Sequence, residues 1–403
     1  TVGINRTHLN KMSDKERADE PQKGRDHVII ENLLTVALAF VAMGILGMMA
    51  LKLTYLGPVA QTMKDFSLTD VYYYALKENG HPDTSRVVTI VDMTDLPDRA
   101  AIAEGLERIM ALGPKTVGVD IVFEGLKADT LADQWLTQLA CDTNIVFSYR
   151  VENYVNDTIG YDHEVHSFFS EEVSPNEGFT NFERRLVGGL KRKLTLSLLC
   201  QGTQRKSLVE QVAEKYAGSA IPHHSAKQLD VNFRPTIFRM VPSDSIEYYR
   251  EWIEDHVVLY GATHELADIH YTPVGEMAGI ELLAYSIQTL LEQSEVKHIS
   301  GWLTAIMSFF IALLTFVGRK AYLKWAKAHR SPWVSFFLTT TFIVGLLMSL
   351  WTITLVWIGF LVFYLTGYSL NWGWAMAAIP FLGGAREFLE LMISQLPGGK
   401  PLK

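Results

Sequence analysis

Apolar stretches without charged residues lie at both ends of the chain, on either side of a polar middle region. The first, Leu33 to Leu51, is close to the roughly 20 residues that a helix needs to cross a hydrocarbon core of about 30 Å. No Ala-x-Ala-like cleavage site follows it, so we predict an uncleaved membrane anchor rather than a signal peptide. A second uncharged run, Ile299 to Gly318, predicts another membrane-spanning helix.

The C-terminal apolar region predicts two further spans. Residues 332 to 364 carry no charge, a run too long for one helix perpendicular to the bilayer and short for two helices with a turn. We predict a long tilted helix from about Val334 to Tyr364, a turn in LTGYSLN, and a last helix from about Leu370 to Leu391. Alternatively, the turn lies near Trp351 and Thr352, and three helices again follow the middle region.

Basic residues set the predicted orientation. The segment after Gly318 is the most basic short loop of the chain and contains no acid. By the positive-inside rule it is cytoplasmic, which places the middle region outside the cytoplasm and both chain ends inside. The predicted layout is a cytoplasmic N-terminal tail (1–27), a first transmembrane helix (28–53), an extracytoplasmic domain (54–298), a second transmembrane helix (299–318), a basic cytoplasmic loop (319–332), transmembrane helices three and four (333–391) and a cytoplasmic C-terminal tail (392–403).

In the middle region, runs rich in β-branched residues alternate with amphipathic segments. Near-continuous apolar strands are typical of a parallel sheet covered on both faces, and alternating strands and helices indicate right-handed βαβ units. We therefore predict an α/β extracytoplasmic domain with a doubly wound, mostly parallel sheet, together with four transmembrane α-helices, one before it and three after. The expected strands are Arg86 to Asp92, Thr116 to Phe123, Asn144 to Tyr149 and His256 to Tyr260, and the expected helices are one through Ile102 and Met110 that closes at Gly113, Leu131 to Leu139, and Ile280 to Gln293.

The last of these helices bears on how the domain connects to the membrane. Ile280 to Gln293 is expected to lead straight into the second transmembrane helix. A movement of the domain would then reach the membrane through one continuous helix.

Charge and cysteine content narrow the class of protein. The formal net charge is -8 and the pI is near 5.9, whereas nucleic-acid binding needs a basic surface, so we expect no nucleic-acid partner. Cys141 and Cys200 are the only cysteines, which leaves open one disulfide if the region faces an oxidising compartment. No Ser-His-Asp order, phosphate loop, HExxH or CxxC motif occurs, so we predict neither catalysis nor a cofactor.

Four segments of the middle region resemble a known family. They are VVTIVDMTD, LGPKTVGVDIVFEG, VNFRP and, most specifically, VVLYGATHELADIHYTPVGEMAGIELLAYSIQTLL. In this order they resemble the type-two CHASE domain, the sensing extracellular module associated with bacterial cyclases and histidine kinases, over roughly residues 54 to 296. One anchor before the domain and three helices after it are the usual layout of that family. The chain departs from the family in two ways. The Trp-Pro-rich stretch of the family is reduced here to MTDLPDRAA, which puts in doubt any pocket built by that loop. The short tail after Leu391 also contains no cytoplasmic output domain.

Candidate ligand-binding residues lie near the ends of predicted strands. Asp92 and Asp120 are at or near the carboxyl ends of two strands, where open α/β sheets bind ligands, and the matching positions of the resembled family are also acidic. The alternative is that these aspartates cap the element that follows. Asp268 also falls on a position of that family, and Thr272 lies in YTPVGEMAG, where a turn is the first reading and a ligand contact the second.

The loop around Asp268 also admits a metal-site reading. His264, Glu265, Asp268 and His270 are side chains of the kind that bind zinc or nickel. A polar loop produces such groupings by chance, and the histidines do not fall on positions of the resembled family. We therefore predict no metal.

The resemblance implies a non-enzymatic sensor or receptor subunit. We expect the domain to respond to an unidentified signal and to pass it through the membrane helices to a separate membrane or cytoplasmic protein partner. The alternative is a structural scaffold subunit of a larger envelope complex for secretion, motility or transport, to which the small residues of the C-terminal helices are suited. Membrane lipid is an expected partner, and a homo-oligomer is left open. The expected location is the inner membrane of a bacterium, with several crossings and the large domain in the periplasm or extracellular space.

Overall fold

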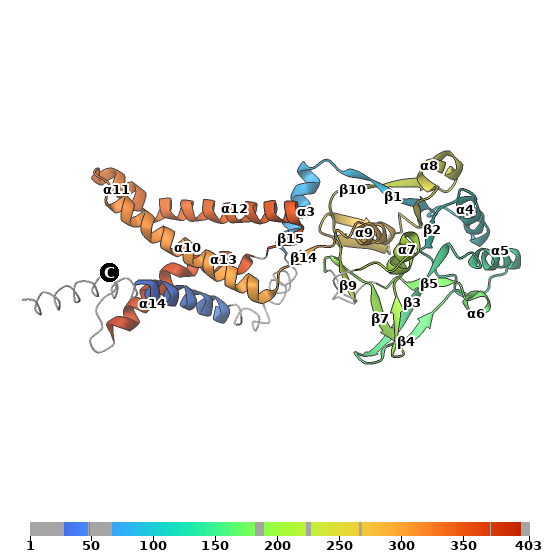
Figure 1. The fold of residues 1–403 in the computed structure, drawn as a ribbon, viewed down its shortest axis with the longest axis horizontal. Coiled ribbons are helices and arrows are strands. Elements are labelled where there is room, and N and C mark those ends of the chain that lie inside the picture. Colours follow the sequence, from blue (N-terminus) through green and yellow to red (C-terminus); the bar gives the residue numbers. More distant parts are fainter. Residues whose placement is uncertain are drawn as a thin grey trace, which may run out of the picture. The chain divides into compact units, whose positions relative to one another are not determined.

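The structure, a computed structural model, describes residues 28–46, 48, 67–181, 189–222, 227–265, 268–370 and 372–395. The predicted N-terminal tail, the end of the first predicted transmembrane helix and most of the predicted C-terminal tail lie outside the described residues. The chain divides into two compact units, one of residues 69–297 and one that joins residues 1–68 to residues 298–403. Figure 1 labels many of the elements of both units.

The first unit is built on a nine-stranded mixed sheet with the order β10-β1-β11-β2-β3-β4-β7-β8, in which β5 also pairs with β3. Strands β10, β1, β11, β2, β3 and β5 are parallel, whereas β4 and β8 pair with their neighbours β3 and β7 in antiparallel fashion. The prediction of an α/β domain with a mostly parallel sheet is thus confirmed. The strands of this sheet are β1 (Asp83–Asp92), β2 (Thr116–Val119), β3 (Ile145–Asn156), β4 (Gly160–Val165), β5 (Asn176–Phe179), β7 (Ser197–Cys200), β8 (Thr203–Lys206), β10 (Thr236–Pro242) and β11 (Val257–Gly261).

Helices cover both faces of the parallel strands. α4 and α5 pack on each other over one face, and α7 and α9 pack on each other over the opposite face. Strand β2 shows the division: Val117 and Val119 join the hydrophobic cluster under α4 and α5, while Gly118 lies on the face of α7. The helices of this unit are α3 (Leu68–Asn79), α4 (Arg99–Ala111), α5 (Thr130–Ala140), α6 (Ser170–Val173), α7 (Leu208–Ala217), α8 (Arg250–Ile253) and α9 (Gly279–Leu291), and the remaining short strands are β6 (Lys193–Thr195), β9 (Gln228–Asp230), β12 (Ile269–Thr272) and β13 (Gly275–Ala278).

Strand β2 is shorter than predicted. The apolar run Thr116 to Phe123 suggests one strand, but pairing stops at Val119. Ile121 and Phe123 turn into the hydrophobic cluster instead, and the backbone N–H of Phe123 donates to the Ser167 hydroxyl over 3.1 Å. The apolar pattern therefore records burial of this segment rather than its pairing in the sheet.

The expectation of one continuous helix from the domain into the membrane is wrong. α9 ends at Leu291, and Gln293 adopts a left-handed backbone conformation with a φ of 51°. A new helix, α10 (Gly301–Lys327), begins after Ser300, whose hydroxyl accepts a hydrogen bond from the backbone N–H of Leu303. This N-cap separates the two helices, so the connection is a non-helical segment.

The two cysteines are not bridged. Both thiols are free, Cys141 being exposed after α5 and Cys200 being buried at the end of β7. The disulfide that the sequence leaves open is therefore absent from the structure.

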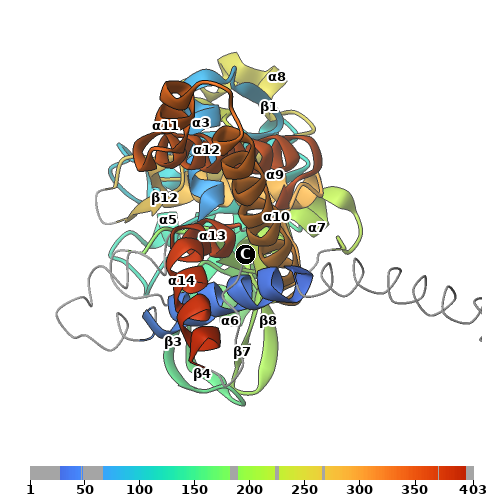
Figure 2. The same cartoon turned by 90° about the vertical axis from the view of Figure 1, so that its left-hand side faces the viewer.

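Among the described residues of the second unit, three helices are long and apolar enough to cross a membrane: Val28–Leu46, α10 and α12 (Thr341–Thr366). The helix Val28–Leu46 packs with α10 and α14 (Leu382–Ser394) through a shared hydrophobic cluster (Figure 2). These segments supply the membrane character that the apolar ends of the sequence predict.

The C-terminal helices differ from the prediction in their breaks. The predicted helix Val334 to Tyr364 is divided at Thr340 into α11 (Pro332–Thr339) and α12, because the Thr340 hydroxyl caps the backbone N–H of Ile343. The alternative turn near Trp351 is also wrong, since α12 runs through it. The predicted last helix is instead α13 (Gly373–Ala378), a 3-10 turn containing Pro380, and α14, so the described residues do not contain a fourth continuous span.

Candidate functional site

The carboxyl ends of three adjacent parallel strands form one edge of the sheet. Asp92, the last residue of β1, lies in register with Gly261, the last residue of β11. Asp120 follows β2 directly, and its backbone N–H donates to the carbonyl of Tyr260 over 2.9 Å. Because neighbouring strands are about 4.8 Å apart, Asp92 and Asp120 flank Gly261 at the edge where open α/β sheets bind ligands.

Asp92 joins two loops through its carboxylate. Its Oδ1 accepts hydrogen bonds from the backbone N–H (3.0 Å) and the hydroxyl (2.6 Å) of Thr94, and from the backbone N–H of Thr263 (3.2 Å). Burial acts to raise the pKa of Asp92, but these hydrogen bonds outweigh it and leave the pKa below its ordinary value. A cavity of about 340 Å³ lies beside Asp92 and is lined by α4 and by the residues that end and follow β10.

Asp120 and Asp268 are brought close together from distant parts of the chain. Burial, and then the negative charges of Asp268 and Glu265, raise the pKa of Asp120 to about 7. Among the described residues, none donates a hydrogen bond to the Asp120 carboxylate. Asp120 therefore changes its charge near neutral pH, whereas the hydrogen-bonded Asp92 remains ionised there.

Asp268 lies against the first residue of α9. A Cβ placed on Gly279 would be 2.1 Å from Asp268 Oδ2, so a side chain at residue 279 would turn this carboxylate away from its place. The amino end of a helix carries a partial positive charge that favours a carboxylate at this place. We define Asp92, Asp120 and Asp268 as the strand-edge site. Through Asp268 this site borders the N-terminus of α9.

Thr272 shapes the hairpin of β12 and β13. Its hydroxyl donates to the carbonyl of Gly275 over 2.7 Å and accepts from the backbone N–H of Val274 at 3.3 Å. Gly275 has a φ of 114°, in the region that favours glycine. The polar atoms of Thr272 therefore serve the turn directly, and any effect on a ligand acts through the position of this hairpin.

The two histidines of the loop after β11 contact different carboxylates. His264 Nδ1 lies 2.6 Å from the Thr263 hydroxyl and 3.8 Å from Asp92 Oδ2, while His270 Nε2 lies 3.1 Å from Asp268 Oδ1. In the parts of the chain that the structure describes, no three His, Cys, Asp or Glu side chains are grouped as a metal site.

A larger cavity, of about 810 Å³, lies at the amino ends of β1 and β10, next to the last turns of α9. It opens where the pairing of these strands is irregular: Thr84 pairs with Ile237, whereas Thr89 pairs with Arg239. The intervening residues of β1 bulge away from β10, and the Ser85 hydroxyl holds the bulge by accepting from the backbone N–H of Val88 over 3.1 Å. The bulge separates the strands and makes room for the cavity.

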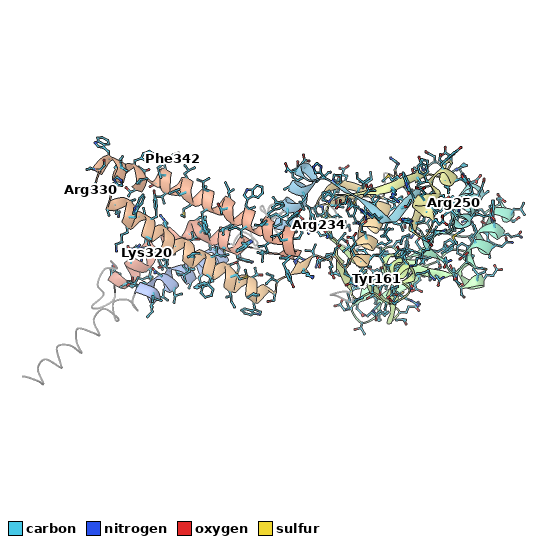
Figure 3. The ribbon with its side chains drawn as sticks, turned by 45° about the horizontal axis from the view of Figure 1, so that its top comes forward. Tyr161, Arg234, Arg250, Lys320, Arg330 and Phe342 are labelled. Atoms are coloured by element: carbon cyan, nitrogen blue, oxygen red, sulfur yellow. The ribbon has the colours of Figure 1, made fainter. Side chains whose placement is uncertain are left out.

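Charged side chains of both signs line this larger cavity. Arg86, Arg234 and Arg239 contribute positive charge, and Asp83 and Glu292 contribute negative charge (Arg234 is labelled in Figure 3). This site was not predicted from the sequence, because ligands were expected only at the carboxyl ends of strands. The available signal was the VNFRP segment, whose asparagine, arginine and proline all line the cavity.

Comparisons with known proteins place the chain in a family. A model of the CHASE2 domain matches residues 37–318, which include most of α10 as well as the α/β unit. No match was found among curated proteins or among solved structures. CHASE2 domains are sensory extracellular domains, and the matched segments include the strand-edge site and the larger cavity. With most of its length covered by this match, the chain belongs to the CHASE2 domain family.

Proposed function

We propose that this chain is a non-enzymatic membrane sensor whose CHASE2 domain detects a signal outside the cytoplasm and whose membrane helices pass the change to a separate protein. The CHASE2 match carries the proposal, because it begins within the apolar helix Val28–Leu46 and ends within α10. A sensory domain held in the sequence between two membrane-competent helices is suited to report across a bilayer.

The proposed topology has four crossings. Val28–Leu46, α10 and α12 supply three of them. The segment from α13 to α14, residues 373–394, would extend about 33 Å along one axis, close to the thickness of the hydrocarbon core. Pro380 interrupts it because proline has no backbone N–H, and such broken helices are tolerated where neighbouring helices cover them.

The basic segment after α10 orients this topology. Arg319, Lys320, Lys324, Lys327 and Arg330 lie between the end of the apolar run and α11, and the positive-inside rule makes this segment cytoplasmic. The CHASE2 domain then lies in the periplasm or extracellular space, and the membrane is the inner membrane of a bacterium.

We propose the strand-edge site as the place where the signal acts. Asp120 carries a charge that no hydrogen bond from the described residues compensates, and Asp268 contacts the first residue of α9. A ligand that neutralises these carboxylates would change the forces on the start of α9. Only residues 292–300 separate the end of α9 from α10, so α9 is the domain helix nearest in sequence to the following membrane span.

The test of the function is to identify what the full-length chain binds. The chain is purified in mild detergent through an affinity tag, and the proteins that remain bound are identified by mass spectrometry. As a matched control, the same purification uses the Asp120→Asn variant, which keeps the shape of the side chain and removes its charge. We expect a kinase, cyclase or other regulator in stoichiometric amount, with its activity altered by the variant.

The scaffold alternative gives a different result. A stoichiometric set of envelope proteins that is recovered equally with the wild type and with the Asp120→Asn variant would contradict the sensor proposal. It would identify the chain as a structural subunit of a larger complex.

A further inference from the structure

An apolar cavity of about 330 Å³ lies between α10 and α12 in the membrane unit. Leu314 and Gly318 of α10 and Leu347 and Trp351 of α12 form much of its wall. Space is available because a Cβ placed on Gly318 would meet no atom within 4 Å. Leu314 and Leu347 are also exposed at the surface of the bundle, so the cavity opens on the side that faces lipid.

The indole and phenol groups of the cavity wall are hydrogen-bonded within the protein. Trp351 Nε1 donates to the Thr315 hydroxyl over 2.9 Å, and the Tyr322 hydroxyl donates to the carbonyl of Leu338 over 3.1 Å. Arg319 lines the cavity with the carbon part of its side chain, and its Nε is buried and has no hydrogen-bond partner. Arg319 also makes no ion pair with any residue that the structure describes.

Lys320 and Arg386, two other cations of the bundle, have partners of their own. Lys320 donates to the side chain of Asn32 over 3.1 Å, and Arg386 pairs with Glu390 at 2.7 Å. The Arg319 guanidinium itself lies beside α14, where a Cβ placed on Gly383 would be 3.3 Å from its Nη1. A phosphate is the anion that the planar set of donors of a guanidinium fits best.

We propose that this cavity binds an anionic phospholipid of the cytoplasmic leaflet, with part of one acyl chain between α10 and α12 and the phosphate on Arg319. The apolar wall matches a hydrocarbon chain, and the one uncompensated charge matches the headgroup. Arg319 ends the uncharged run of α10 and begins the basic segment, which is the depth of lipid headgroups on the cytoplasmic side. Basic pockets between membrane helices on that side are suited to acidic headgroups. The site does not depend on the sensor proposal, because a scaffold subunit would bind the lipid equally well.

The test measures which lipid the full-length chain keeps. The protein is reconstituted in nanodiscs of phosphatidylcholine with an equal amount of phosphatidylglycerol, released in mild detergent, and weighed by native mass spectrometry. We expect the wild type to retain phosphatidylglycerol in preference to phosphatidylcholine. Arg319→Gln should lower retention of phosphatidylglycerol about tenfold or more, as expected for the loss of a charge-assisted contact.

Two matched controls separate this site from general attraction to a basic surface. Arg330→Gln removes the same charge from the basic segment at a residue that does not line the cavity, and should leave retention unchanged (Arg330 is labelled in Figure 3). Gly318→Leu fills the cavity without changing charge and should lower retention, whereas Gly345→Leu, on an open face of α12 outside the cavity, should not.

Several results would overturn the proposal. If the wild-type protein retained phosphatidylglycerol no better than phosphatidylcholine, the proposal would be overturned, whether or not the variants fold. Equal losses in Arg319→Gln and Arg330→Gln would indicate non-specific attraction. Displacement of the lipid by inorganic phosphate, together with no effect of Gly318→Leu, would show that the site takes free phosphate and not a lipid.

Discussion

Replacing Asp120 with asparagine should stabilise the protein at neutral pH and change little at pH 4. In the folded protein, burial and the charges of Asp268 and Glu265 raise the pKa of Asp120 to about 7 from an ordinary value of 3.8. An acid with a raised pKa binds its proton more tightly in the folded state than in the unfolded state. The folded state is favoured by this proton below about pH 4, and the advantage is lost as the pH rises to about 7.

The magnitude follows from the two pKa values. The difference between 3.8 and about 7 corresponds to at most about 4 kcal/mol of lost stability at neutral pH. The side chain is only partly shielded from solvent, which screens its charge, so we expect about 1 to 3 kcal/mol. The Asp120→Asn variant cannot ionise and should recover this amount above pH 7. Asp268→Asn should recover a smaller part, because it removes only one of the repelling charges.

The assay is thermal unfolding of the full-length chain in detergent between pH 4 and pH 8, followed by tryptophan fluorescence. Asp162→Asn, at an exposed aspartate of β4, is the control and should shift the melting temperature equally at all pH values. The reasoning would be refuted if Asp120→Asn changed stability by the same amount at pH 4 and at pH 8. A variant less stable than the wild type at pH 8 would show that the charge stabilises the fold.

Three further predictions concern packing, an ion pair and orientation. Gly279→Ala places a Cβ 2.1 Å from Asp268 Oδ2, so the carboxylate must turn away from α9, and thermal stability should fall by up to about 1 kcal/mol. Asp133→Ala should lower the free energy of unfolding, measured with denaturant, by about 3 kcal/mol. It removes the carboxylate that lies 2.6 Å from the mostly buried Arg99 and leaves this arginine without its counter-ion. In intact cells from which the outer barrier has been removed, a membrane-impermeant maleimide should label Cys141, which is exposed, and spare Cys200, whose pKa burial raises to about 11.

Each of these has its own check. Gly301→Ala meets open space and should leave the melting temperature unchanged; an equal loss from both glycine variants would contradict the packing argument. Arg99→Ala combined with Asp133→Ala should cost less than the sum of the single changes, and additive costs would mean that the two side chains do not interact. Labelling of Cys141 only after the cytoplasmic membrane is broken would place the domain on the cytoplasmic side.

Local sequence patterns correctly predicted the elements that form without regard to which distant segments they contact. The β-branched run before Asp92 forms β1, and the apolar spacing from Ile102 to Ile109 forms the buried face of α4, ended by Gly113 with its positive φ of 72°. Both features follow from side-chain periodicity and from the backbone freedom of glycine. The order of these elements was enough to predict a mostly parallel sheet.

Features that depend on distant contacts could not be read from periodicity. The apolar run through Phe123 has the composition of a strand, and only its contact with Ser167 shows that it leaves the sheet. The separation of α9 from α10 depends on the backbone of Gln293 and on the Ser300 cap, which are weak signals beside two long apolar helices.

The candidate site was predictable in position but not in its interactions. Strand ends identified Asp92 and Asp120, yet the closeness of Asp120 to Asp268 arises from folding of distant segments. Gly279 was expected to shape a turn, whereas the structure uses its missing side chain to admit a carboxylate. The larger cavity depends on a bulge in β1, for which the sequence has no distinct pattern.

The position of β1 in the sheet has a consequence for how the chain is made. β1 is the first strand of the domain, yet the strands that it pairs with are β10 and β11. Val88, for example, can pair only once Val257 has been made. In the proposed topology the chain leaves the cytoplasm with β1 in front, so both edges of this apolar strand stay open until nearly the whole domain has been exported. Strands that pair late are slow to fold and prone to wrong associations. In this topology the long interval between export of β1 and export of β11 is the stage at which the chain is most open to wrong association.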